Sequence, residues 1–158
     1  TGMDRTFFLL PWAHTRMHTN KRTHTHTNVR TNTYRCIWSA AFIGDQYEGA
    51  FDKGQAHGQG HLVTVKGDRY VGTYIDGHAC GQGVKTWADG RRYSGEWKRS
   101  REHGKGRMEW PDGSWCEGSW AKGQMHGQGV LVNAHGDRYE GGWRWHKLHG
   151  AGSWTYAR

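Results

Sequence analysis

Histidine is the residue type in this chain with the clearest potential for chemistry, because imidazole binds transition metals. The chain of 158 residues contains twelve histidines. Four of them recur at multiples of 23 residues, namely His57, His103, His126 and His149. If each unit of 23 residues is a β-hairpin, equivalent positions in neighbouring units lie two strand spacings apart, roughly 10 Å. Zinc needs its ligand nitrogens at about 2 Å, so we expect neither a metal site nor a bound cofactor.

No combination of residues suggests covalent or acid–base catalysis. The sequence lacks a Ser, His and Asp motif and a Cys and His pair of the kind that nucleophilic enzymes use. The recurring Gly-Gln-Gly and Gly-Lys-Gly resemble pieces of phosphate-binding loops, but no Gly-Lys-Ser or Gly-Lys-Thr follows them. We therefore predict no catalytic residues and no enzymatic activity.

Basic residues interleaved with aromatic ones could bind anionic head groups or nucleic acid. The densest group is the candidate lipid contact, and it consists of Lys98, Arg99, Arg101, Lys105 and Arg107. Acidic neighbours such as Glu96 and Glu102 weaken the positive field, so nucleic acid is not an expected partner. Residues 1–46 carry six Lys and Arg against two Asp and Glu, a net +4 that is half of the total +8.

The composition does not suit a conventional globular core. Only 34% of the residues are hydrophobic, whereas 13% are aromatic and supply large contact areas from few side chains. Cys36, Cys80 and Cys116 are odd in number and show no metal-binding spacing, which predicts reduced thiols in a cytoplasmic protein. No apolar run approaches the roughly 18 residues of a membrane span.

Two short phrases recur in fixed register and decide the fold. The first has the form Tyr-x-Gly-x-Trp or a close variant, and occupies residues 47–51, 70–74, 93–97, 116–120 and 139–143. The second is His-Gly-x-Gly or a close variant, and occupies residues 57–60, 80–83, 103–106, 126–129 and 149–152. Such exact periodicity indicates a repeat architecture in which each unit covers its neighbour.

Each unit reads as a β-hairpin. The ring, glycine and ring of the first phrase stand at i, i+2 and i+4, which places them on one face of a strand. Turn residues such as Lys53-Gly54 and Asp76-Gly77 separate the two phrases. The sequence therefore predicts an all-β protein, a single elongated, twisted antiparallel sheet about 48 Å long made of five consecutive hairpins. Rings of one hairpin are expected to cover the mid-strand glycines of the next, as in aromatic rescue.

The predicted organisation has three parts. Residues 1–33 form a low-complexity tail rich in Thr and His, which we expect to be disordered and which could be an artefact of the gene model. Residues 34–46 are a candidate degenerate cap strand. The five repeats follow as 47–69, 70–92, 93–115, 116–138 and 139–158. The chain starts without Met and stops in a strand, which favours a fragment or an end that meets another chain.

The repeated pattern resembles the MORN repeat, the membrane occupation and recognition nexus. The resemblance covers residues 45–158 and implies a twisted, groove-shaped sheet of hairpins. It also implies settings at membranes, in cilia or on the cytoskeleton, and beside kinase or methyltransferase domains. This chain departs from the pattern at Cys80, Ser100, Cys116, Asn133 and His146. At the fourth unit, Trp115 precedes Cys116, so its ring is expected on the opposite face.

Three functions follow as hypotheses. The first is a non-enzymatic scaffold that binds protein partners, including a second copy as a homodimer. Its groove is predicted to be made and lined by Tyr47, Phe51, Tyr70, Tyr74, Tyr93, Trp97, Trp120, Tyr139 and Trp143. The second is a peripheral tether that binds phosphoinositides at the inner face of a membrane. The third is a regulatory module of a phosphatidylinositol phosphate kinase or a lysine methyltransferase.

Overall fold

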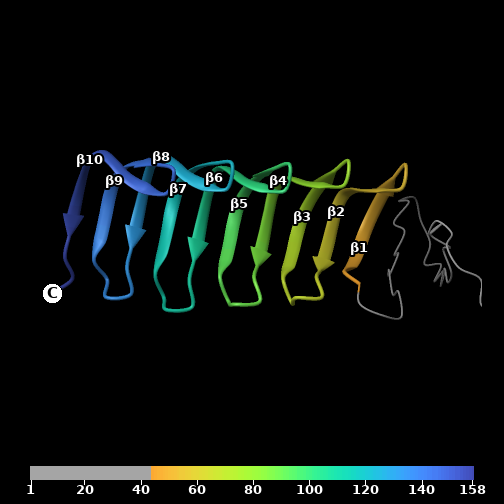
Figure 1. Cartoon of the computed structure of the whole chain (residues 1–158), viewed down its shortest axis with the longest axis horizontal. Coiled ribbons are helices and arrows are strands. Elements are labelled where there is room, and N and C mark those ends of the chain that lie inside the picture. The colour runs from red at the N-terminus through yellow and green to blue at the C-terminus, as the bar shows by residue number, and fades with distance from the viewer. Residues whose placement is uncertain (1–43) are drawn as a thin grey trace, which may run out of the picture.

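The computed structural model describes residues 44–158, and the part of the chain that it describes is one open antiparallel sheet. All ten strands pair with their neighbours in chain order (Figure 1). Their bounds are β1 Gln46–Asp52, β2 Gln55–Val63, β3 Arg69–Ile75, β4 His78–Thr86, β5 Arg92–Lys98, β6 Arg101–Glu109, β7 Trp115–Ala121, β8 Gln124–Val132, β9 Arg138–Arg144 and β10 Lys147–Thr155. The all-β fold class and the five consecutive hairpins are confirmed. The predicted tail (1–33) and most of the predicted cap strand (34–43) lie outside the described residues.

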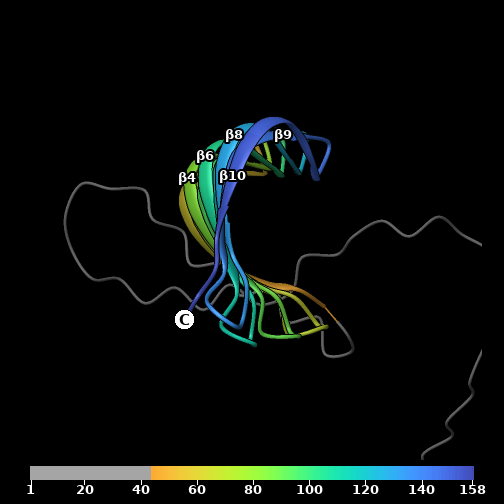
Figure 2. The ribbon, with the colours of Figure 1, turned by 90° about the vertical axis from the view of Figure 1, so that its left-hand side faces the viewer.

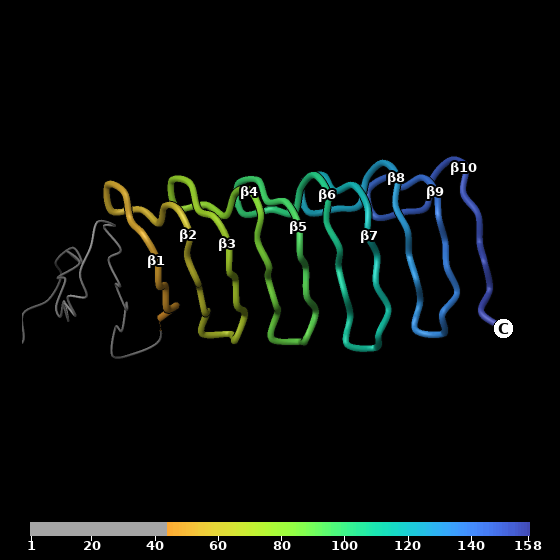
Figure 3. The backbone as a smooth tube through the Cα atoms, turned by 180° about the vertical axis from the view of Figure 1, so that it is seen from behind, coloured from red at the N-terminus to blue at the C-terminus, as the bar shows by residue number. Residues whose placement is uncertain are grey.

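Two-residue turns close the hairpins at one edge of the sheet. Figure 3 shows these hairpin tips along one edge and the loops between units along the other. Both residues of each turn have positive φ, as in Lys53 (46°) and Gly54 (81°). A pair of positive φ values is the signature of the type I′ turn, whose twist matches that of the flanking strands.

Ser100 and His146 stand where the other turns have glycine, and both hold a positive φ of 60° and 64°. Each donates its N–H to a carbonyl of the preceding hairpin, Ala79 or Met125, as the turn glycines also do. Each side chain also accepts a hydrogen bond from the N–H of that same residue, at 3.2 Å for Ser100 Oγ and 3.4 Å for His146 Nδ1. This reciprocal bond offsets the cost of a non-glycine residue in the left-handed region.

A glycine bulge bends the second strand of every hairpin. In the first hairpin Gly49 pairs with Gly60 and Phe51 pairs with Ala56, so three residues of β2 oppose one of β1. Gly58 lies in this bulge with φ 72°, a conformation that glycine adopts without steric cost. Viewed along the ladder, the strands have a C-shaped cross-section (Figure 2).

Aromatic rings cover the glycines in two different ways. Tyr47 lies over Gly60 of its own hairpin, where an added methyl group would collide with the ring. Trp97 instead reaches the preceding hairpin, and its indole Nε1 donates to the Gly83 carbonyl at 3.0 Å. Trp120 repeats this bond with Gly106 at 2.9 Å. The expectation that rings cover the next hairpin is therefore wrong in direction, because tryptophan reaches the preceding hairpin and tyrosine covers the glycines of its own unit.

The rings also contact one another edge to face along the ladder. The centroids of Tyr47 and Tyr74 are 5.1 Å apart, and those of Tyr70 and Trp97 are 5.2 Å apart, with ring planes nearly perpendicular. The same geometry joins Tyr93 to Trp120 at 5.1 Å. Edge-to-face pairs stabilise by about 0.5–1.5 kcal/mol each beyond their buried area. Successive hairpins are thus coupled through their rings as well as through backbone hydrogen bonds.

The fourth hairpin replaces the tyrosine by a smaller pair of side chains. Cys116 occupies the tyrosine position and is 2% exposed, and the fully buried Met125 extends its methyl group over Gly118 and Gly129. Methionine fills irregular gaps well because it is unbranched and flexible. The indole Nε1 of Trp143, which follows this hairpin, has no hydrogen-bond partner among the described residues, unlike those of Trp97 and Trp120.

This compensation predicts a strong coupling between positions 116 and 125. Met125→Ala should destabilise the sheet by about 2–5 kcal/mol because it opens a cavity over two glycines. Cys116→Tyr should cost about 1–3 kcal/mol because Met125 already fills the space. The double variant restores the Tyr and Ala combination of the first two hairpins, Tyr47 with Ala56 and Tyr70 with Ala79.

The double variant should therefore be more stable than either single variant. Thermal unfolding followed by near-ultraviolet circular dichroism measures the three changes. Strictly additive losses would show that Met125 does not substitute for the missing ring.

Candidate functional site

The predicted groove aromatics form the core of the sheet. Eight of the nine are at most 8% exposed, and Phe51 is half-buried against them. We call the side of the sheet that carries these rings the ring face. Their burial assigns them a structural role, and it leaves little of their surface for a partner. Whether any of them contacts a partner stays a prediction.

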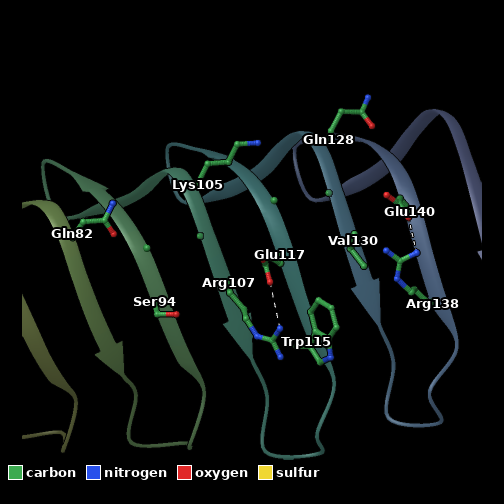
Figure 4. A pocket seen from close by; sticks show the side chains of 14 residues that line it. Gln82, Ser94, Lys105, Arg107, Trp115, Glu117, Gln128, Val130, Arg138 and Glu140 are labelled. Carbon is green, nitrogen blue, oxygen red and sulfur yellow. Dashed lines mark hydrogen bonds and ion pairs between the residues drawn. The ribbon is translucent and has the colours of Figure 1, made fainter.

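The alternate residues of each strand form the opposite side, which we call the polar face. Over β4 to β9 this face contains a shallow hollow of about 840 Å³ (Figure 4). Its floor is a stripe of four mid-strand glycines, which lack side chains that would fill it. The stripe consists of Gly95, Gly106, Gly118 and Gly129, and the main side chains around it are Gln82, Ser94, Lys105, Arg107, Trp115, Glu117, Gln128, Val130, Arg138 and Glu140.

Arg107 is the centre of the charge network in this hollow. Its guanidinium contacts Glu109 at 2.9 Å and Glu117 at 3.3 Å. The guanidinium also stacks on the Trp115 ring, with 4.0 Å between its carbon and the ring centroid. Trp115 therefore lies on the polar face, as its displacement from position 116 predicts. Stacking and two carboxylates fix the orientation of the arginine fork.

Two other basic residues of the hollow also have local partners, Arg138 in an ion pair and Lys105 in hydrogen bonds. Arg138 contacts Glu140 at 2.6 Å. Lys105 Nζ donates to Ser119 Oγ at 3.1 Å, and the Lys105 N–H donates to Glu96 at 2.9 Å. Exposed ion pairs of this kind stabilise the fold by about 0–1 kcal/mol each. Their larger effect is to present ordered groups of both charges to whatever enters the hollow.

The predicted lipid contact divides into two places in the structure. Lys105 and Arg107 belong to the polar face and are engaged there, as described above. Lys98, Arg99 and Arg101 are exposed at the tip of the third hairpin. The five residues are close together in the sequence, but they belong to two different surfaces of the structure.

The hairpin tips bring together cations that sequence inspection did not group. Lys122 lies at the tip of the fourth hairpin, and Arg144 and Lys147 flank the tip of the fifth. With the three cations of the third tip they make six exposed positive side chains along one edge. We call this set the basic edge: Lys98, Arg99, Arg101, Lys122, Arg144 and Lys147. The 23-residue period could have revealed this set in the sequence, because Arg99, Lys122 and Trp145 occupy equivalent turn positions.

The histidines of the described residues do not form a metal site. Within residues 44–158 no three His, Cys, Asp or Glu side chains are placed to share a metal ion. The repeated histidines lie at the strand bulges, and the Nδ1 atoms of His57 and His126 are buried without a partner. Within the same range there is also no helix that is long and apolar enough to span a membrane.

Comparison with known families gives one clear match. The model of the MORN repeat matches five consecutive segments, residues 47–69, 70–91, 93–115, 116–138 and 139–158. These segments are the five hairpins described above, and the matched family is a repeat module, not a catalytic domain. Against the curated proteins the chain has no match.

The tyrosines of the ring face predict a loss of stability in alkali. Burial is the main cause that raises the pKa of Tyr70 from 10.0 to about 12, and burial likewise raises the pKa of Tyr74 and of Tyr93. The unfolded chain ionises its tyrosines near pH 10. Stability is therefore fully present below pH 10 and should fall as the pH rises from 10 towards 12.

The measurement is the thermal midpoint between pH 9 and 12, followed together with tyrosinate absorbance. Tyr70→Phe is the matched control, because it keeps the ring and removes the titrating group. This variant should lose less stability between pH 10 and 12 than the unmodified protein. Complete tyrosine ionisation by pH 12 with an unchanged thermal midpoint would contradict the assignment.

Proposed function

The chain belongs to the MORN repeat family, and we propose that it is a non-enzymatic scaffold whose polar face binds a segment of a partner protein. The observation that carries this proposal is the open hollow over β4 to β9. Its volume of about 840 Å³ is within the usual range of binding sites, about 300–1,000 Å³. The ring face supports the proposal indirectly, since its aromatic side chains are already buried by one another.

The lining of the hollow suits an extended polypeptide. The glycine stripe allows a bound backbone to approach the sheet closely, because no side chain stands between them. Gln82 and Gln128 offer amide donors and acceptors, while Arg107 and Glu117 offer both charges. Trp115 is the one large ring on this lining, and tryptophan and arginine are the residue types that most often dominate binding energy.

The test begins with selection of linear peptides from a displayed library on the full chain. Selected peptides are then titrated against Trp115→Ala and Arg107→Ala. Each variant should weaken binding by about tenfold or more, since truncating a binding hot spot costs about 2 kcal/mol or more. Arg69→Ala is the matched control, because Arg69 occupies the equivalent position to Trp115 two units earlier, outside the hollow.

Equal affinity of the selected peptides for all three variants would refute the polar-face proposal. Light scattering of the unmodified protein tests whether the partner is a second copy. A dimer that dissociates in the Trp115→Ala and Arg107→Ala variants would identify the second copy as the bound segment. A monomer would assign the hollow to a different protein.

The basic edge favours a second candidate, peripheral binding to an anionic membrane. Its six cations fall within the 4–8 that commonly mark a surface for anionic lipids, and Glu102 is the acidic residue among them. Trp145 is 45% exposed and Leu148 is 43% exposed beside these cations. A tryptophan among basic residues suits the interface between head groups and acyl chains. A location at the inner face of a membrane would follow.

Vesicle co-sedimentation tests this candidate. Binding to vesicles that contain phosphatidylserine should weaken steeply with salt. Lys122→Ala, Arg144→Ala and Lys147→Ala together should reduce the partition constant by about a hundredfold, since each basic residue near the surface contributes about 1 kcal/mol. Lys53→Ala is the control, because Lys53 is the equivalent of Arg99 at the first tip. Partitioning that ignores both the salt and the triple substitution would exclude the candidate.

A further inference from the structure

The loops between units are joined by a recurring aspartate. Asp45 accepts a hydrogen bond from the Val65 N–H at 3.1 Å, and Asp68 accepts one from the Ala88 N–H at 3.0 Å. Asp137 accepts the same bond from Ala157 at 3.0 Å. In every case the acceptor lies 20 residues before the donor, at the end of the previous loop. The aspartate thus ties each loop to the next one along the ladder.

The other two loops lack this aspartate, and they differ in whether the residue opposite has an N–H that needs an acceptor. Arg91 occupies the aspartate position opposite Pro111, which has no N–H to satisfy. Ser114 occupies it opposite Ala134, which does have an N–H. The Ser114 hydroxyl donates instead to Asp112 at 2.6 Å. Among the five equivalent loop positions that the structure describes, Ala134 alone has an N–H without a protein acceptor.

A ring is missing beside this free N–H. Trp87, Trp110 and Tyr156 supply an aromatic side chain at the position that Asn133 occupies in the fourth loop and Thr64 in the first. Asn133 is folded into its own loop, where its Oδ1 accepts the Asp137 N–H and its Nδ2 donates to the Asp137 carboxylate, both at 2.9 Å. The ring position is left open, and a hollow of about 440 Å³ lies there, lined by Trp110, Asp112, Ser114, Leu131, Asn133, Ala134 and His135.

The charge next to the hollow restricts what can bind. Asp112 lies on its lining, and its carboxylate accepts hydrogen bonds from the N–H and the hydroxyl of Ser114. A second carboxylate at the Ala134 N–H would meet this negative charge, and like charges at close range repel. A neutral acceptor, such as an amide oxygen, satisfies the N–H without that repulsion. Trp110 and Leu131 provide the apolar surface that a ring needs.

We propose that this hollow is a socket for a protein segment that carries an aromatic side chain next to an Asn or Gln. The ring packs between Trp110 and Leu131, in the place that Asn133 leaves open. The amide oxygen accepts the hydrogen bond of Ala134. The socket lies at the loop edge on the ring face, so it is separate from the polar-face hollow and does not depend on that proposal.

The experiment uses the full chain and the probe peptide acetyl-Gly-Asn-Trp-Asn-Gly-amide, titrated by two-dimensional NMR. The Ala134 amide and the Trp110 indole resonances should shift together and saturate. Replacing the Trp of the peptide by Ala should abolish the shifts, and replacing both Asn by Asp should weaken binding about three- to tenfold. No saturable shift at these two groups, or equal binding of the Asp peptide, would overturn the proposal.

Two variants of the protein complete the test. Ala134→Pro removes the donor, and the fold accommodates proline at the equivalent Pro111. It should weaken peptide binding about three- to tenfold, read at the Trp110 indole. Asn133→Trp fills the ring position and should abolish binding. Unchanged peptide binding by a folded Ala134→Pro variant would refute the hydrogen bond. If the same resonances shift with protein concentration in the absence of peptide, the socket binds a second copy of the chain.

Discussion

The packing of a tyrosine ring over a pair of glycines is the contact on which the rest of this structure depends. A single sheet has no second layer to bury its side chains, so each unit must cover its own backbone. Gly49 and Gly60 face each other across β1 and β2, and Tyr47 covers both. Any larger residue at Gly60 would displace that ring. Each ring therefore needs its pair of glycines, and this need recurs with the 23-residue period.

This requirement leaves the two faces of the sheet with different surroundings. The rings on the ring face contact each other from Tyr47 to Trp120, and little of their surface is left exposed. The polar face keeps the other side of the same glycines open, which is why its hollow lies over Gly106 and Gly118. Because successive side chains of a strand lie on opposite faces, the residues of the ring face are constrained by packing while those of the polar face are not. Substitutions on the polar face can therefore change its surface without altering the core.

The fold could be predicted from the sequence because its determinants are local and periodic. Ring, glycine and ring at i, i+2 and i+4 specify the face, and Lys53-Gly54 specifies the turn. The candidate surfaces were less predictable, because they join side chains from different units. Lys105 and Arg107 were grouped with Lys98 by proximity in sequence, yet the bulge and the alternation place them on another surface. To predict the basic edge, one must compare turn residues that are 23 positions apart in the sequence. To predict the hollow, one must know which rings are buried.

Departures from the repeat are of two kinds, and the distinction bears on function. Cys116 is compensated by Met125, Arg91 by Pro111, and the strained turn at Ser100 by its bond to Ala79. In each case the loss is offset, because Met125 fills the space, Pro111 needs no acceptor, and the Ser100 hydroxyl accepts the Ala79 N–H. Ser114 and Asn133 are different, because no residue of the described sheet replaces the lost acceptor or the lost ring. Asn133 closes its own loop through hydrogen bonds to His135 and Asp137, so its side chain contributes to folding while leaving the ring position empty.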